Sequence, residues 1–111
     1  MVQINQKVLS LLGLACAAGK AASGNTAVEE ALRSLRVKAL FLQSDCSENT
    51  VKQYRAKATF ANVPFYLVEE KALGASVGHP ERKVVAILDI GFAKAIEKEI
   101  CLLNNFGGVG Q

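Results

Sequence analysis

The stretch Ala39-Leu40-Phe41-Leu42 decides the fold, because it places four apolar residues in a row between Lys38 and Gln43. A short continuous apolar run with polar residues at both ends is typical of a strand that is buried on both faces of a sheet. Such a strand needs helices above and below it. We therefore predict that residues 39–42 form an inner strand of a layered α/β domain.

Two further segments, residues 64–68 and 84–88, are also predicted to be strands. Pro64 is acceptable as the first residue of its strand, because proline cannot donate a hydrogen bond to a neighbouring strand. A short helical stretch around Leu73, ending at Gly78, separates the two segments. A short extended piece is also expected at residues 21–23.

Apolar residues at helical spacing predict two helices before the 39–42 strand. The first covers residues 4–18 and is ended by Gly19. The second starts at Gly24-Asn25-Thr26 and ends near Leu35, with Val28, Ala31, Leu32 and Leu35 at helical spacing. Helices and strands therefore alternate from the beginning of the chain.

Two longer helices are predicted in the rest of the chain. One is capped by Ser47, and the other runs from Phe92 through Leu103. Residues 104–111 contain three glycines and are expected to form a flexible tail. The 111 residues thus predict one helix-sheet-helix domain at residues 1–103, without a linker or an internal repeat.

No part of the sequence suggests export or a membrane. No apolar run approaches the roughly 20 residues that cross a bilayer, and the N-terminus lacks the pattern of a signal peptide. Cys16, Cys46 and Cys101 are widely spaced, which argues against a disulfide framework and against a zinc site. We expect a cytoplasmic protein with reduced thiols.

Positive charge is concentrated in one part of the chain, although the formal net charge is only +3. Residues 20–57 contain seven Lys and Arg against four Asp and Glu, and the rest of the chain contains six of each class. The basic residues of this part are Lys20, Arg33, Arg36, Lys38, Lys52, Arg55 and Lys57. Such an excess is where contacts to phosphates are sought first, although a solvated helix face explains the same pattern.

The sequence offers few residues for catalysis. Residues 13–20 are similar to a phosphate-binding loop, but five residues instead of four separate Gly13 from Gly19, and Ala21 replaces the Ser or Thr that binds magnesium. His79 is the only histidine and lies in a predicted loop. We therefore expect neither an enzyme nor a cofactor.

Asp45 and Asp89 each follow a predicted strand, where α/β proteins often place carboxylates that bind metal or transfer protons. Asp45 also lies just before Ser47, and Asp89 just before Gly91. Helix capping and turn formation therefore account for both carboxylates without metal binding or proton transfer, and we favour these structural roles.

Several segments at the predicted element boundaries together resemble a known family. They are Leu11-Leu12-Gly13-Leu14-Ala15, Ala18-Gly19-Lys20, Ser23-Gly24, Asp45-Cys46-Ser47-Glu48-Asn49-Thr50, Val63-Pro64, Leu73-Gly74, Gly78 and Asp89-Ile90-Gly91-Phe92-Ala93-Lys94. The chain resembles the bacterial, YlxQ-like branch of the L-seven-Ae family of kink-turn RNA-binding proteins over residues 7–98.

The resemblance implies a three-layer α/β/α sandwich with a mixed four-stranded sheet. It also implies a partner, which is structured RNA such as ribosomal RNA or another kink-turn RNA, and an association with the ribosome. Neither a membrane nor DNA is an expected partner.

The resemblance places the RNA contacts at the start of the second helix and in the loop before the last strand. The first region is Gly24-Asn25-Thr26, and the second contains His79 and Arg82. A glycine permits close backbone approach, and a helix start offers unpaired N–H groups to phosphate. Further phosphate contacts are expected from Lys20, Arg33, Arg36 and Lys38.

Four positions depart from the pattern of the RNA-binding relatives. Ala22 and Ser23 stand where these relatives carry basic residues, and Ala27 and Glu30 stand where they carry Glu and Lys. Two hypotheses follow. The protein is an RNA-binding accessory or ribosome-associated protein, or it is a protein-interaction module that kept the fold and lost specific RNA binding.

Overall fold

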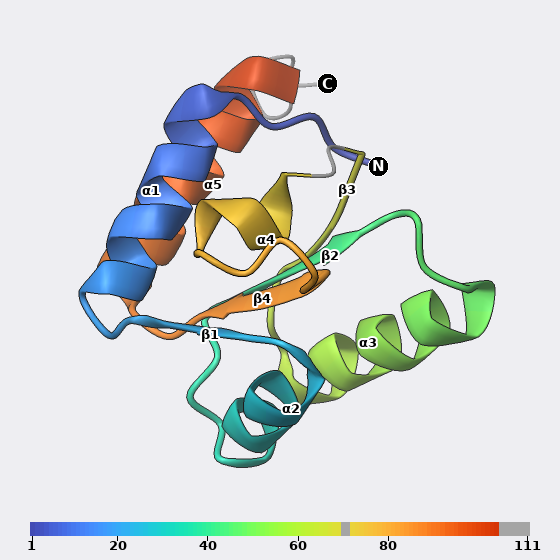
Figure 1. Ribbon diagram of the computed structural model, residues 1–111. Coiled ribbons are helices and arrows are strands. Elements are labelled where there is room, and N and C mark those ends of the chain that lie inside the picture. The colour runs from blue at the N-terminus through green and yellow to red at the C-terminus, as the bar shows by residue number, and fades with distance from the viewer. Residues whose placement is uncertain (70–71, 105–111) are drawn as a thin grey trace.

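The computed structural model describes residues 1–69 and 72–104, in which helices and strands alternate (Figure 1). In chain order the elements are α1 (Gln6–Ala17), β1 (Ala21–Ser23), α2 (Asn25–Arg33), β2 (Ala39–Gln43), α3 (Glu48–Ala61), β3 (Phe65–Val68), α4 (Leu73–Ser76), β4 (Val84–Ile87) and α5 (Ile90–Asn104). Within these ranges no helix has the length and apolar character that a membrane span needs. Cys16, Cys46 and Cys101 are unbridged and half-buried.

The described strands form one four-stranded sheet in the order β1-β4-β2-β3. β4 is antiparallel to both of its neighbours, β1 and β2, whereas β2 and β3 are parallel. The predicted mixed four-stranded sheet is therefore confirmed. β2 and β4 occupy its centre, and every residue of both strands is buried.

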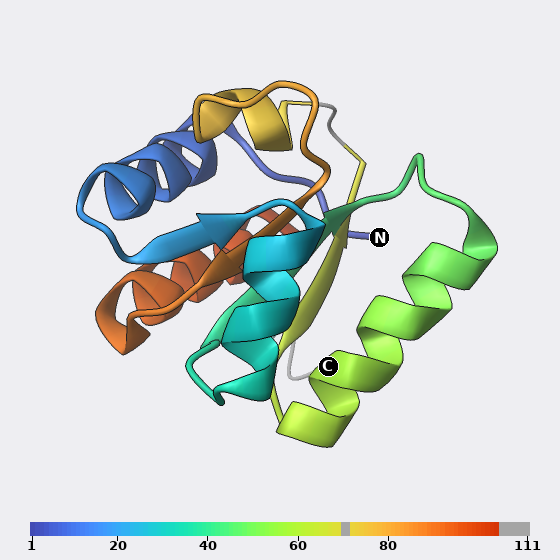
Figure 2. The ribbon, with the colours of Figure 1, turned by 60° about the horizontal axis from the view of Figure 1, so that its bottom comes forward.

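Helices cover both faces of the sheet, as Figures 1 and 2 show. α1, α4 and α5 lie on one face, and α2 and α3 lie on the other. Successive side chains of a strand point to opposite faces. Phe41 accordingly joins the core under α1 and α5, whereas Leu40 and Leu42 join the core under α2 and α3. The predicted three-layer α/β/α sandwich is confirmed.

Local capping groups set several helix ends where the sequence placed them. The Asn5 side chain accepts a hydrogen bond from the Val8 N–H at 3.0 Å and starts α1, and Gly19 closes it with a φ of +73°. Ser47 Oγ accepts from the Thr50 N–H at 3.1 Å and caps α3. The ends at Gly19 and Ser47 were predicted, because each depends on residues within one turn, whereas the Asn5 cap was not and the predicted start of the first helix was residue 4.

The C-terminal prediction needs one correction. Asn104 does not begin a tail, because it is the last residue of α5, and its side-chain amide donates to the Gln3 carbonyl at 2.9 Å. The rest of the predicted flexible tail, residues 105–111, lies outside the described residues.

The end of α2 also differs from the prediction. The helix ends at Arg33, and Leu35, which was counted among its apolar residues at helical spacing, is 71% exposed with a left-handed φ of +58°. The following Arg36 N–H turns back to the Ala31 carbonyl at 3.0 Å. Glycine or asparagine usually holds this left-handed position after a helix, because a larger side chain is strained there.

Replacing Leu35 by asparagine is expected to raise the free energy of unfolding by about 1 kcal/mol, because asparagine tolerates the left-handed conformation and no buried contact is lost. Urea denaturation measures the change. The neighbouring, exposed Ser34→Asn is the control and should change stability by less than about 0.5 kcal/mol. A destabilised Leu35→Asn protein would mean that the leucine side chain supports the core.

Candidate nucleic-acid interface

The start of α2 is set by the backbone of Gly24. This residue follows β1 directly, with φ +86° and ψ 157°, and its N–H donates to the Val84 carbonyl at 3.0 Å. Only glycine adopts this conformation readily. Gly24 supplies no side-chain cap, so the N–H groups of Asn25, Thr26 and Ala27 have no side-chain acceptor within the described residues. Such groups suit an anionic ligand.

The side chain of Asn25 is held by α3. The hydroxyl of Tyr54, which is only 4% exposed, donates to Asn25 Oδ1 at 2.6 Å. Burial raises the pKa of Tyr54 to about 12, with smaller contributions from Glu29 and Cys46, so the hydroxyl remains a donor at neutral pH. This bond occupies the oxygen of the exposed Asn25 amide and leaves its NH₂ group for a ligand.

Arg82 lies against the same helix start. Its Nη1 donates to Ser23 Oγ at 2.8 Å, and a Cβ added at Gly24 would lie 3.3 Å from Arg82 Cδ. The arginine side chain therefore crosses directly over the position where Gly24 has no side chain. Glu81 Oε2 lies 3.7 Å from Arg82 Nε, and the Glu81 side chain is 70% exposed.

The turn that carries Arg82 is positioned by α4. The His79 N–H donates to the Gly74 carbonyl at 2.9 Å, and the Arg82 N–H donates to the His79 carbonyl at 2.9 Å. A Cβ added at Gly74 would collide with the carbonyl oxygens of both His79 and Arg82. Gly74 is therefore the residue that lets the turn pack on α4 and reach the start of α2.

Two polar hollows flank Gly24. One, of about 520 Å³, is bounded by Ser23, Gly24, Asn25, Thr26, Ala27, Glu30 and Arg82. The other, of about 420 Å³, lies toward the start of α3 and includes Ser47, Thr50 and Lys83. The helix start and the loop before the last strand, which were predicted as two separate regions, thus form one continuous surface.

Four of the predicted basic residues lie elsewhere. The Lys20 carbonyl accepts from the Leu88 N–H at 2.8 Å, and the Lys38 N–H donates to the Ile87 carbonyl at 2.7 Å. Both lysines therefore flank the end of β4 that is opposite to the Gly24–Val84 contact. Arg33 and Arg36 lie at the far end of α2, about 13 Å away for a nine-residue helix. The structure does not gather these residues around the helix start.

The basic residues that line the two hollows each face a carboxylate. Arg82 Nε is 3.7 Å from Glu81 Oε2, and Lys83 Nζ is 3.5 Å from Asp45 Oδ2. His79 lines neither hollow, and its Nδ1 lies 3.7 Å from Glu81 Oε2. Ion pairs with this much exposure contribute only about 0–1 kcal/mol, so a phosphate can replace the carboxylate at low cost. The charge arrangement is therefore compatible with an exchangeable anion.

Three contributors to this interface were not predicted from the sequence. They are Ser23, which accepts a hydrogen bond from Arg82, Tyr54, which holds Asn25, and Lys83, which lines a hollow. Nothing local connects Tyr54 to Asn25, which is 29 positions away in the sequence. Lys83 carried a usable signal, because it follows Arg82 at the end of the predicted contact loop.

The two carboxylates considered for chemistry have structural contacts. Asp89 Oδ2 accepts from the Phe92 N–H at 3.0 Å at the start of α5, as its predicted capping role requires. Asp45 contacts Lys83 and accepts from Gln43 Nε2 at 3.3 Å, contacts that the prediction of a cap or turn role did not include. Across residues 1–69 and 72–104, no three His, Cys, Asp or Glu side chains come together as a metal site.

The structure is thus a three-layer α/β/α domain whose second helix begins at an uncapped glycine, beside the turn that carries Arg82. The chain belongs to the ribosomal protein L7Ae/L30e/S12e/Gadd45 family, whose model matches residues 6–97. The resemblance found in the sequence is thereby confirmed.

Two bacterial proteins are similar to this chain in sequence, and one solved structure is similar to it in fold. The RNA-binding protein YlxQ of Bacillus subtilis (strain 168) is 42% identical over 87 residues, which are 78% of this chain and 87% of the relative. The RNA-binding protein YlxQ of Enterococcus faecium is 38% identical over 96 residues, 86% of this chain and 92% of the relative. A solved structure of a protein with unknown function from Bacillus halodurans C has a TM-score of 0.79 at 32% identity, covering 86% of this chain and 98% of that one.

Replacing Gly24 by alanine is expected to lower the free energy of unfolding by about 1–3 kcal/mol, because its φ and ψ are strained for any residue with a Cβ. Urea denaturation measures the loss. Gly19→Ala is the matched control, since Gly19 also has a positive φ but nothing within 4 Å of an added Cβ. Only Gly24→Ala should also displace the Arg82 side chain, which the Nε resonance of Arg82 reports. An unchanged resonance would contradict the contact.

Proposed function

We propose that this protein binds folded RNA at the start of α2, that the RNA is a kink-turn, and that binding takes place in the cytoplasm in association with the ribosome. The observation that carries the proposal is the convergence of Gly24, Asn25 and Arg82 on one exposed surface. The family and the printed names of the relatives, which describe RNA-binding proteins, support the same class of ligand.

Each part of the surface has a task in this proposal. Gly24 lets the RNA backbone approach closely, and the N–H groups of the first turn donate hydrogen bonds to a phosphate. The NH₂ group of Asn25 donates to a base edge. Base edges are accessible where regular A-form geometry is broken, as it is beside the tandem G·A pairs of a kink-turn.

Arg82 explains how the helix start remains basic without a basic residue at position 22 or 23. Its guanidinium reaches Ser23 Oγ from the turn before β4 and brings positive charge to the place where the RNA-binding relatives carry it on β1. A phosphate that displaces Glu81 from Arg82 gains a charge-assisted hydrogen bond. Ala27 and Glu30 have no comparable compensation among the described contacts.

Asn25→Ala should weaken binding to a kink-turn RNA by roughly 5- to 150-fold, the range of about 1–3 kcal/mol for one base contact. Tyr54→Phe should weaken it less, because the amide stays but loses its orienting hydrogen bond. Gel-shift titration at fixed salt measures both. Tyr66→Phe is the matched control, since Tyr66 is a second tyrosine with a pKa raised to about 12, mainly by burial, and its ring stacks on Phe41 of the neighbouring strand.

The specific part of the proposal is tested with the same RNA after its G·A pairs are replaced by Watson–Crick pairs. The kink-turn should bind more tightly than this control. Equal, weak binding to both RNAs would remove kink-turn recognition. Equal loss in Tyr54→Phe and Tyr66→Phe would remove the role of the Asn25 contact.

The alternative is a protein-interaction module that kept the fold and lost specific RNA binding. The two hypotheses differ in the RNA affinity that they predict when Ala27 and Glu30 are replaced. If α2 docks RNA, the double variant Ala27→Glu, Glu30→Lys should tighten kink-turn binding about tenfold or more, because the change restores the relatives' residues at the first hollow. Affinity unchanged by the double variant, together with unchanged affinity in Asn25→Ala, would favour the alternative. Filter binding with the two RNAs measures both.

A further inference from the structure

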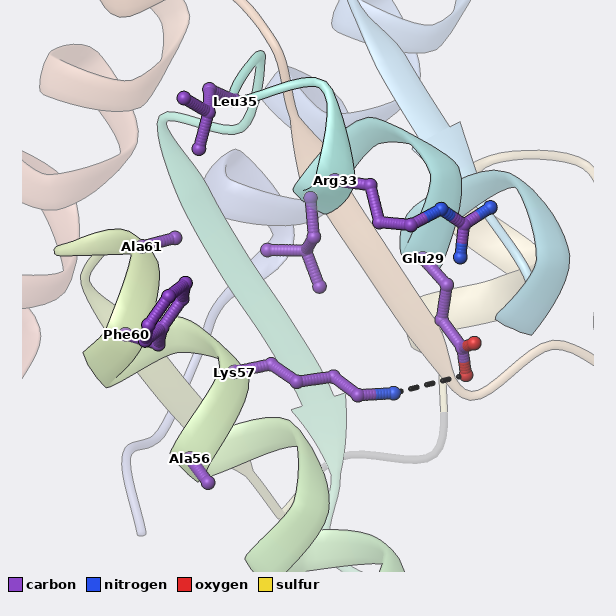
Figure 3. Close-up of a pocket in the computed structure, with 8 residues that line it drawn as sticks. Glu29, Arg33, Leu35, Ala56, Lys57, Phe60 and Ala61 are labelled. Carbon is purple, nitrogen blue, oxygen red and sulfur yellow. Dashed lines mark ion pairs between the residues drawn. The ribbon is translucent and has the colours of Figure 1, made fainter.

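A second surface lies between α2 and α3, at the end of α2 that is distant from Gly24. It is a groove of about 720 Å³ lined by Glu29, Leu32, Arg33, Leu35, Ala56, Lys57, Phe60 and Ala61 (Figure 3). Lys57 reaches from α3 to Glu29 of α2, and their charged atoms are 3.3 Å apart. The groove therefore lies between two helices that an ion pair holds together, and its floor is apolar.

Two large apolar side chains of this groove are exposed to solvent. Phe60 is 93% exposed, which is unusual for an aromatic residue, and Leu35 is 71% exposed in a backbone conformation that disfavours leucine. Figure 3 shows the two side chains at the same end of the groove, Leu35 on the segment after α2 and Phe60 on α3. Neither side chain contributes to the core, and the backbone of Leu35 is strained. Exposed apolar residues of this kind indicate a surface that another molecule covers.

The charge at the groove points to the character of that molecule. Glu29 is already paired with Lys57, whereas the exposed Arg33 has no ion pair within the described residues. Arg36 follows Leu35, is also exposed and is likewise unpaired in that part of the chain. The uncompensated charge beside the apolar floor is therefore positive, and a partner with carboxylates is complementary to it.

We propose that this groove binds an acidic amphipathic helix of a partner protein. Its apolar side chains contact Leu35 and Phe60, and one of its carboxylates pairs with Arg33. This mode matches the way amphipathic helices dock into grooves between helices. A second copy of this chain fits less well, because it would bring Arg33 and Arg36 of both copies together. RNA fits less well too, because the floor is aliphatic apart from one ring and Glu29 lies within it.

The partner and the RNA can bind together. Arg33, the last residue of α2, is eight residues beyond Asn25, a separation of about 12 Å along the helix axis. The inference therefore goes beyond the proposed function, and its test needs no RNA-binding activity.

The test uses the full chain, labelled for NMR, and two synthetic helical peptides. Both carry leucines at positions i, i+3, i+4 and i+7, and their remaining polar positions are mainly Glu in one and Lys in the other. The Glu peptide should shift resonances of Leu32, Leu35, Phe60 and Ala61 at sub-millimolar concentration, and the Lys peptide should bind at least about tenfold more weakly. Gly24 and Arg82 should not shift.

Three variants test the contacts. Phe60→Ser should weaken the Glu peptide about tenfold or more, as expected for a central aromatic anchor. Leu35→Asn should weaken it too although this protein is expected to be at least as stable as the parent, so unfolding cannot explain the loss. Arg33→Gln should remove most of the preference for Glu over Lys.

Other outcomes would overturn the inference. Equal shifts with the two peptides would exclude charge-selective docking. Concentration-dependent self-association that Phe60→Ser abolishes would identify a second copy as the occupant. Shifts of the same groove residues with single-stranded oligouridine, and none with the Glu peptide, would identify RNA.

Discussion

The burial of both faces of β2 and β4 is the constraint on which this structure depends. Every residue of the two strands is covered by helices, so their backbone groups are satisfied inside the sheet and no ligand reaches them there. Polar function is restricted to the ends of the sheet and to the helices outside it. Gly24 bonds to the first residue of β4, and Arg82 precedes that strand, so the candidate interface lies at one end of the central pair.

The features that were predictable from the sequence are those that depend on neighbouring residues. The 39–42 run identified the central strand because continuous burial needs continuous apolar character, and Ser47 and Gly19 marked helix ends because caps act within one turn. Leu35 was placed in the second helix because the prediction used only the spacing of neighbouring apolar residues. Helical spacing continued through it, but the backbone had already turned into a left-handed conformation that spacing does not reveal.

The grouping of site residues could not be predicted in the same way, because it depends on strand register. The basic residues from 20 to 38 are close in sequence, yet β1 and α2 carry Lys20, Arg36 and Lys38 away from Gly24. In their place the antiparallel pairing of β4 brings Arg82 to Ser23 across 59 positions of sequence. The positive charge near the helix start thus depends on which strands are paired, and it could not be predicted from the composition of the neighbouring sequence.

Two contacts between α2 and α3 lie between the two outer surfaces of the molecule. Tyr54 bonds to Asn25 near one end of α2, and Lys57 pairs with Glu29 one turn further along. The contact that orients the Asn25 amide therefore comes from the same helix that forms one wall of the groove. If a molecule in the groove altered the affinity at Asn25, a ligand at Asn25 would alter the affinity of the groove by the same factor.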